Sequence, residues 1–230
     1  MTAACALVRG SAALTSSGPT FAAAVRAQFG VDLVVPFEHF DTASPRALLP
    51  GSTIARLDVD TFADKGRIVR LADATLCHVP GLNYGSPQGS TSFRQTGSTD
   101  IKSDAREAKL LFGLDNESLA SIKGYRIQLS RTRLFNIPFD RLSQFAAQTG
   151  ADPKCAGASS NKAVVSRSLI ATVDVTITSQ RPLPPDLLER IGKTLSPGSP
   201  VTLRWDTGSA YSYSVTLPDR WIGVRTEPQF

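Results

Sequence analysis

The segment AVVSRSLIATVDVTITS, residues 163–179, constrains the fold of this chain more than any other stretch. Apolar and polar side chains alternate over most of it, which is the period of a β-strand with one buried face. The apolar face carries Leu169, Ala171, Val173, Val175 and Ile177. The opposite face is mostly polar and carries Ser168, Thr172, Asp174, Thr176 and Thr178. The segment predicts a strand about twice as long as the usual ~5–6 residues.

A second segment of similar length, YRIQLSRTRLFNI at residues 125–137, has the same property. Its alternation predicts one apolar face with Tyr125, Ile127, Leu129, Phe135 and Ile137. Arg131 and Arg133 interrupt that face, and Pro138 ends the strand. Both segments exceed the ~9–11 residues with which a tilted strand crosses a bilayer, and both alternate as membrane-barrel strands do. A long strand in a soluble, twisted sheet explains the pattern equally well.

The rest of the chain alternates between short helices and short strands. Helical patterns occur at 21–29, 104–114, 141–149 and 186–195. Thr20 and Gly30 are placed to begin and end the first of these helices. Strand patterns occur at 31–37, 53–59, 67–71, 74–79, 201–205, 210–217 and 221–226. This order predicts an α+β fold, a mostly antiparallel, twisted β-sheet with several short helices packed on it.

The length of 230 residues predicts a single α+β domain over 1–230. Within it we expect an N-terminal helical segment at 1–30 and a mobile loop, rich in Gly and Ser, at 80–103. Arg9 and Gly10 interrupt the apolar N-terminus, so a secretory signal is not expected. No apolar run approaches the ~20 residues of a membrane-spanning helix. We therefore expect a protein that is soluble as made and cytoplasmic, and able to move to the inner membrane.

The net charge of +5 at pH 7 favours anionic partners, an anionic membrane among them. Basic residues are scattered, and the candidates for a basic surface are Arg126, Arg131 and Arg133. Phe135 on the same strand could stack on a nucleic-acid base beside these arginines. A core-facing aromatic side chain next to exposed arginines explains the pattern better. No specific nucleic-acid partner is therefore predicted.

The motif Asp206-Thr207-Gly208, within LRWDTGSAYSYSV, has the form of an aspartic protease site. Such a site needs two carboxylates that share a proton, and the chain contains no second Asp-Thr/Ser-Gly motif. A homodimer could supply one, but little chain follows the motif, and Arg204-Trp205 replaces the small apolar pair expected before it. Asp206 is instead predicted to lie in a tight turn between two amphipathic strands.

Cysteine and histidine are too few for the common catalytic or metal-binding arrangements. The three cysteines, Cys5, Cys77 and Cys155, form no CxxC motif and fit a reducing compartment. The only histidines are His39 and His78, and adjacent residues of a strand, such as Cys77 and His78, point to opposite faces. Phosphate-binding, dinucleotide-binding and hydrolase motifs are also missing. The sequence therefore predicts no catalytic residue, no metal site and no cofactor.

The order of elements resembles that of bacterial gasdermins, which are pore-forming proteins of antiphage defence. FGVDLVVPFEHFDTASPRALL is similar to the early strand of that family and the turn after it. KLLFGLDNESLASIKGYRIQLSRTRLFNIPFDRLSQFA is similar to its helix, long strand and following helix, and SLIATVDVTITS to a strand that can extend into a membrane hairpin. PPDLLERI, VTLRW, AYSYSV and WIGVRT resemble its closing helix and strands. The resemblance implies that Cys5, near the N-terminus, is a lipidation site.

The leading hypothesis is a non-enzymatic protein that associates with membranes and forms an oligomeric β-barrel pore, in bacterial defence. Its membrane-strand candidates are Leu169, Val173, Val175, Ile127 and Leu129. In such a pore Thr172, Asp174 and Thr176 would face the lumen. One alternative is a soluble assembly subunit that self-associates or pairs through sheet edges. Another is an enzyme whose polar groups, such as those of His39, Cys77 and Cys155, converge only in space.

Overall fold

The computed structural model describes residues 19–36, 48–50, 52–54, 58–70, 76–77, 93–96, 101–138, 141, 144, 163–196, 201–205 and 211–228. Its helices are α1 (Phe21–Phe29), α2 (Ile101–Phe112), α3 (Asn116–Ser121) and α5 (Pro185–Leu195). Its strands are β1 (Leu33–Val34), β2 (Thr53–Ile54), β3 (Asp58–Thr61), β4 (Arg67–Arg70), β5 (Leu76–Cys77), β6 (Phe93–Thr96), β7 (Ile122–Asn136), β8 (Ala163–Ser179), β9 (Arg204–Trp205) and β10 (Ser212–Pro228).

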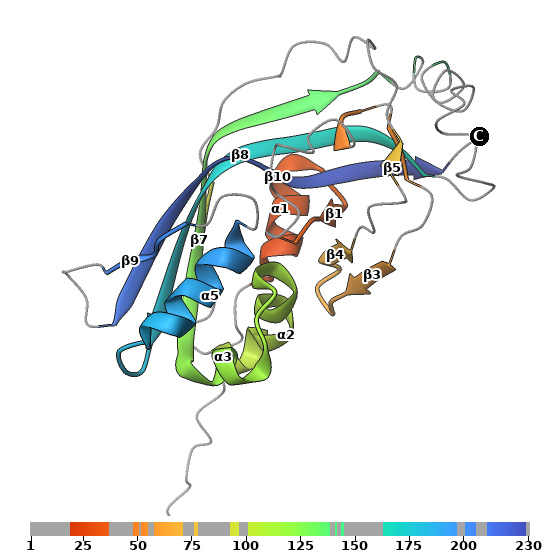
Figure 1. Cartoon of the computed structure of the whole chain (residues 1–230). Coiled ribbons are helices and arrows are strands. Elements are labelled where there is room, and N and C mark those ends of the chain that lie inside the picture. Colours follow the sequence, from red (N-terminus) through yellow and green to blue (C-terminus); the bar gives the residue numbers. More distant parts are fainter. Residues whose placement is uncertain are drawn as a thin grey trace, which may run out of the picture.

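The described strands form one curved sheet, and the helices gather along one side of it (Figure 1). The main order is β3-β4-β1-β10-β8-β2-β5, with β7 also on β8, β6 on β7 and β9 on β10. Among the described pairings only that of β1 with β4 is parallel. The predicted α+β fold with a mostly antiparallel sheet is confirmed.

Helix α1 begins and ends where its sequence predicts. The Thr20 hydroxyl accepts a hydrogen bond from the Ala23 N–H at 3.2 Å, which satisfies one of the unpaired donors of the first turn. Gly30 adopts a left-handed conformation, with φ of 63°, and its N–H donates to the Arg26 carbonyl. A Cβ at Gly30 would also displace the flexible end of the Arg167 side chain, but the left-handed backbone is the reason that favours glycine here.

Two carboxylates from distant segments hold the start of α1. Glu107 of α2 is 1% exposed, and it accepts from the N–H groups of Phe21 and Ala22, both at 3.0 Å. The Tyr125 hydroxyl of β7 donates to the same carboxylate at 2.9 Å. Asp64, in the turn between β3 and β4, accepts from the Thr20 N–H at 2.7 Å. Glu107 therefore joins α1, α2 and β7 through one buried group.

One hydrophobic cluster lies between the sheet and the helices. Helix α1 contributes Phe21 and Val25, and α5 contributes Ile191 and Leu195. The Phe112 ring of α2 packs edge-to-face on the ring of Tyr125, with centroids 5.1 Å apart. The inner faces of β7, β8 and β10 form the other wall of this cluster.

Several predicted elements need correction. The strand predicted over 53–59 is two strands, β2 and β3, and the predicted strand at 31–37 is reduced to β1. The segment 80–103, predicted as a loop, contains β6 and the start of α2. A strand of polar composition forms there because β6 pairs with β7, and a partner distant in sequence is invisible to local composition.

Near the C-terminus, the strands predicted over 210–217 and 221–226 are one strand, β10, because bulges absorb Pro218 and Asp219 instead of ending it. Helix α3 was not predicted, although Asp115 caps it by accepting from the Ser118 N–H at 2.7 Å. Most of the helix predicted over 141–149 lies outside the described residues.

Candidate functional site

The three longest strands lie side by side, with β8 between β7 and β10. They contain 15, 17 and 17 residues in the order β7, β8 and β10, which is longer than the ~9–11 residues a tilted membrane strand requires. Leu129 pairs with Val173, and Val173 pairs with Leu217, so one row of side chains crosses all three strands. We call this unit the three-strand sheet and treat it as the candidate functional site.

The inner face of the three-strand sheet is apolar and covered. The five membrane-strand candidates lie on it at 0–1% exposure: Ile127, Leu129, Leu169, Val173 and Val175. Helices α2 and α3 contact β7, and Leu187, Ile191 and Leu195 of α5 belong to the same cluster. Figure 1 shows α2, α3 and α5 on one side of these strands. In the folded protein these residues therefore form core, and their contact with lipid stays a prediction.

The outer face is polar over the half of the sheet that contains Ser212–Leu217 of β10. Its exposed or half-buried side chains are Arg126, Gln128, Ser130, Asp174, Thr176, Thr178, Ser214 and Thr216. The Thr216 hydroxyl donates to the Asp174 carboxylate at 2.5 Å across the two strands. Of the three predicted lumen residues, Asp174 and Thr176 are half-buried here, whereas Thr172 is 9% exposed. The sheet is therefore amphipathic through its thickness.

A bulge in β7 changes the predicted position of Arg133. The strand has one extra residue between Ser130 and Arg133, and Arg131 within it has φ of 50°, a left-handed conformation that is unfavourable for arginine. The extra residue reverses the alternation beyond it. Arg133 consequently pairs with Ile170 and lies on the outer face with Arg126.

The prediction that Phe135 shares the face of Ile127 is wrong for the same reason. Leu134 pairs with Leu169, which is on the inner face, and Phe135 pairs with Ser168. No residue type in the sequence marks this bulge, since neither glycine nor proline occurs between Tyr125 and Ile137. The partner strand β8 reveals it, because β8 is regular over the same rows.

Strand β10 has a bulge at nearly the same level, on the other side of β8. Its register shifts between Leu217 and Arg220, and Asp219 within it has φ of 48°. The Arg133 guanidinium forms an ion pair with the Asp219 carboxylate at 2.6 Å, across β8. The two bulges increase the local bend of both strands that flank β8, and the three strands curve together in Figure 1.

The basic candidates are therefore not equivalent. Arg126 is exposed on the outer face, and Arg131 is exposed at the bulge. Arg133 is half-buried, and Asp219 compensates its charge. Among the described residues no ion pair is found for Arg126 or Arg131, so these two carry uncompensated charge.

Other candidate residues lie mostly outside the described part of the chain: Cys5, His39, His78, Cys155 and Asp206. Cys77 lies in β5, paired opposite Thr53. The antiparallel pairing of β9 and β10 agrees with the predicted hairpin, but Trp205 is opposite Tyr213, so seven residues separate the paired positions and the predicted tight turn does not fit this register. Across the described residues, no group of three His, Cys, Asp or Glu side chains could hold a metal ion. No helix in the same residues is long and apolar enough to span a membrane.

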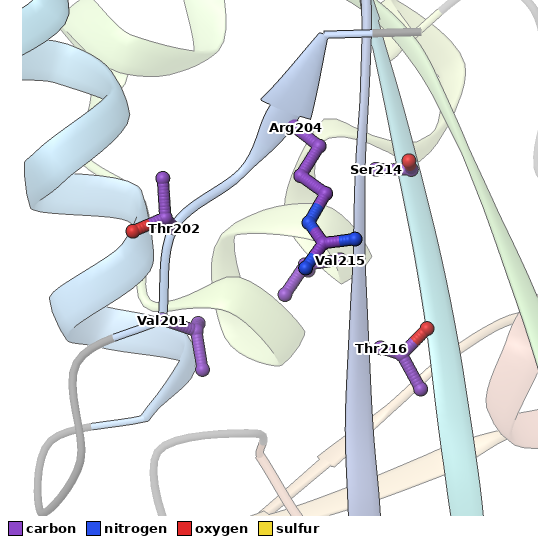
Figure 2. Close-up of a pocket in the computed structure, with 6 residues that line it drawn as sticks. All are labelled: Val201, Thr202, Arg204, Ser214, Val215 and Thr216. Atoms are coloured by element: carbon purple, nitrogen blue, oxygen red, sulfur yellow. The ribbon is translucent and has the colours of Figure 1, made fainter.

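A pocket that the sequence did not predict lies at the edge of the three-strand sheet. It has a volume of about 500 Å³ and is lined by Val201, Thr202, Arg204, Ser214, Val215 and Thr216. Figure 2 shows the segment that carries Val201 and Thr202 on one side of the pocket and β10 on the other. Segment 201–203 packs on α5, since a Cβ at Gly192 would lie 2.1 Å from the Val201 carbonyl oxygen.

Comparison with known proteins finds no match among protein-family models and none among curated proteins. Among solved structures, the fold is similar to that of a bacterial gasdermin from Bradyrhizobium tropiciagri, with 17% sequence identity and a TM-score of 0.46. The similarity covers 90% of this chain and 84% of that chain.

Proposed function

We propose that this protein is a non-enzymatic, membrane-associating protein that forms an oligomeric β-barrel pore. The observation that carries the proposal is the three-strand sheet. Its three neighbouring strands exceed the length of a membrane strand, with one apolar face and an opposite face that is polar over half of the sheet. The resemblance of the sequence to bacterial gasdermins adds a role in bacterial antiphage defence.

To become part of such a pore, the folded protein must release α2, α3 and α5 from the inner face of the three-strand sheet. Lipid tails are as apolar as the helical side chains they replace, so the inner-face residues of the strands stay in an apolar environment. The ladder hydrogen bonds of the sheet stay intact, as hydrocarbon requires. Three strands cannot close on themselves, because the smallest membrane barrels contain about eight. Several copies must therefore assemble, and their outer faces, with Asp174 and Thr176, then line the lumen.

Approach to the membrane is supported by charge. The chain carries a net charge of +5, and Arg126 and Arg131 are exposed. A basic residue near an anionic bilayer contributes about 1 kcal/mol. A lipid on Cys5 would supply a second anchor, and stable membrane attachment generally needs two.

Dye release from liposomes tests the proposal directly. We expect leakage from vesicles that contain anionic lipid, either with the intact chain or after limited proteolysis, and oligomers in the membrane pellet. No leakage and no pelleting under either condition would refute it. A defined oligomer that forms on size exclusion without lipid, combined with no leakage, would favour the assembly function instead.

The lumen assignment has its own test, in the ion selectivity of the pore. Thr176→Lys adds a positive charge to the outer face, so the reversal potential in planar bilayers should shift toward anion selectivity. Thr194→Lys is the matched control, because Thr194 lies on α5 outside the three-strand sheet, where its hydroxyl donates to the Arg190 carbonyl. Equal selectivity in the two variants would contradict this orientation of the strands.

A further inference from the structure

The pocket between residues 201–204 and β10 combines a cation with hydroxyl groups. Arg204 pairs with Ser214 across the β9–β10 ladder, and Thr202 precedes it on the same wall. Figure 2 shows the Arg204 side chain extending along the space between that wall and β10, with its guanidinium beside Val215. Val201 and Val215 supply the apolar lining.

Arg204 is exposed, and among the described residues no carboxylate forms an ion pair with it. The side chains of paired strand residues share a face, so the pairings Arg126–Thr176, Thr176–Ser214 and Ser214–Arg204 form one row on the outer face. Strands about 4.8 Å apart place the Cα atoms of the two arginines at opposite ends of the row, roughly 14 Å apart. The hydroxyls of Thr176 and Ser214 lie between them.

Asp174 limits where an anion can bind. Its carboxylate accepts from the Thr216 hydroxyl at 2.5 Å, so that hydroxyl hydrogen is not available to a ligand. An anion at the Thr216 end would also be repelled by the Asp174 charge. The favourable position is therefore at the other end of the pocket, between the Arg204 guanidinium and the Ser214 hydroxyl, because the Thr202 hydroxyl in Figure 2 points away from β10.

We propose that this pocket binds the phosphate group of a phosphomonoester. A guanidinium donates two parallel hydrogen bonds to two oxygens of an anion. A carboxylate has only those two oxygens, whereas a tetrahedral phosphate keeps a further oxygen for the Ser214 hydroxyl. Val201 and Val215 would contact the carbon skeleton of the ligand. Pore formation is a separate property, so this inference goes beyond the proposed function.

Calorimetric titration with glycerol 3-phosphate tests the proposal in the absence of membranes. Arg204→Gln should weaken binding at least tenfold, because it removes a charged, two-bond contact. Asp174→Asn removes the opposing charge and should strengthen binding several-fold. Arg131→Gln is the control, since it makes the same charge change at an exposed arginine outside the pocket, and its affinity should equal that of the unchanged protein. Melting curves verify that each variant is folded.

The source of the phosphate is decided by a second arm with vesicles of phosphatidylcholine, with and without phosphatidic acid. Binding of glycerol 3-phosphate that depends on Arg204 indicates a free phosphomonoester. Arg204-dependent pelleting with phosphatidic acid alone indicates a lipid headgroup. The proposal is overturned if neither probe binds, or if Arg204→Gln and Arg131→Gln weaken the binding of glycerol 3-phosphate alike. Failure in the membrane-free titration leaves dye release unaffected, so the two proposals fail independently.

Discussion

Replacing Glu107 by glutamine keeps the size of the side chain and removes only its charge and one acceptor oxygen. One carboxylate oxygen accepts from Phe21 N–H and the Tyr125 hydroxyl, and the other accepts from Ala22 N–H. A glutamine can place its carbonyl oxygen toward Phe21 and Tyr125. Its amide then faces the Ala22 N–H, and two donors meet with no acceptor between them.

The expected cost follows from that count. A buried backbone N–H left without an acceptor costs about 1–3 kcal/mol. The remaining hydrogen bonds lose their charge assistance, and α1 loses a negative charge at its N-terminus, which adds about 1 kcal/mol. We expect Glu107→Gln to lower the free energy of unfolding by about 2–4 kcal/mol. At about 2–4 °C per kcal/mol for a chain of this length, the melting temperature should fall by roughly 5–15 °C.

Chemical and thermal unfolding, followed by circular dichroism, measure this loss. Glu189→Gln is the control, because Glu189 is exposed on α5 and forms an i,i+4 pair with Lys193 at 2.6 Å. It should cost less than about 0.5 kcal/mol. Tyr125→Phe removes one partner of Glu107 and should cost about 1–2 kcal/mol, less when combined with Glu107→Gln. A loss below about 0.5 kcal/mol for Glu107→Gln would mean that the carboxylate is not ionised in the folded protein, and the reasoning would be refuted.

Two further predictions concern the pocket wall and acid stability. Gly192→Ala places a Cβ 2.1 Å from the Val201 carbonyl oxygen, so segment 201–203 must shift. We expect a stability loss of about 1–3 kcal/mol, measured by denaturation. The variant should also bind glycerol 3-phosphate more weakly in the calorimetric titration. Burial raises the pKa of Asp64, but hydrogen bonds from Thr20 and Gly66 outweigh burial and hold that pKa below its usual value. A lowered pKa stabilises the fold above the unfolded value of about 3.9, and this contribution disappears as pH falls through the folded value. Asp64→Ala should therefore be destabilising at pH 7, and its cost should shrink as pH falls below the unfolded value of about 3.9; a cost that does not change over this range would contradict it.

Elements with purely local signals were predicted well. Helix α1 follows from Thr20, Gly30 and the apolar spacing between them, and α5 covers the predicted range 186–195 and begins one residue earlier, at Pro185. Strand β8 has the predicted bounds, since its regular alternation needs no partner to be recognised. The amphipathic character of the candidate site was visible for the same reason.

The sequence by itself therefore determined helices α1 and α5, the long strand β8 and the two faces of β8. Only the tertiary structure decided which outer-face residues meet, because the bulge at Arg131 is defined by its pairing with β8. The bond from Phe21 to Glu107 joins residues 86 positions apart, and the pocket brings residue 204 opposite residue 214. Periodicity and caps act within a few residues, whereas register, bulges and buried polar contacts depend on partners that only the folded chain brings together.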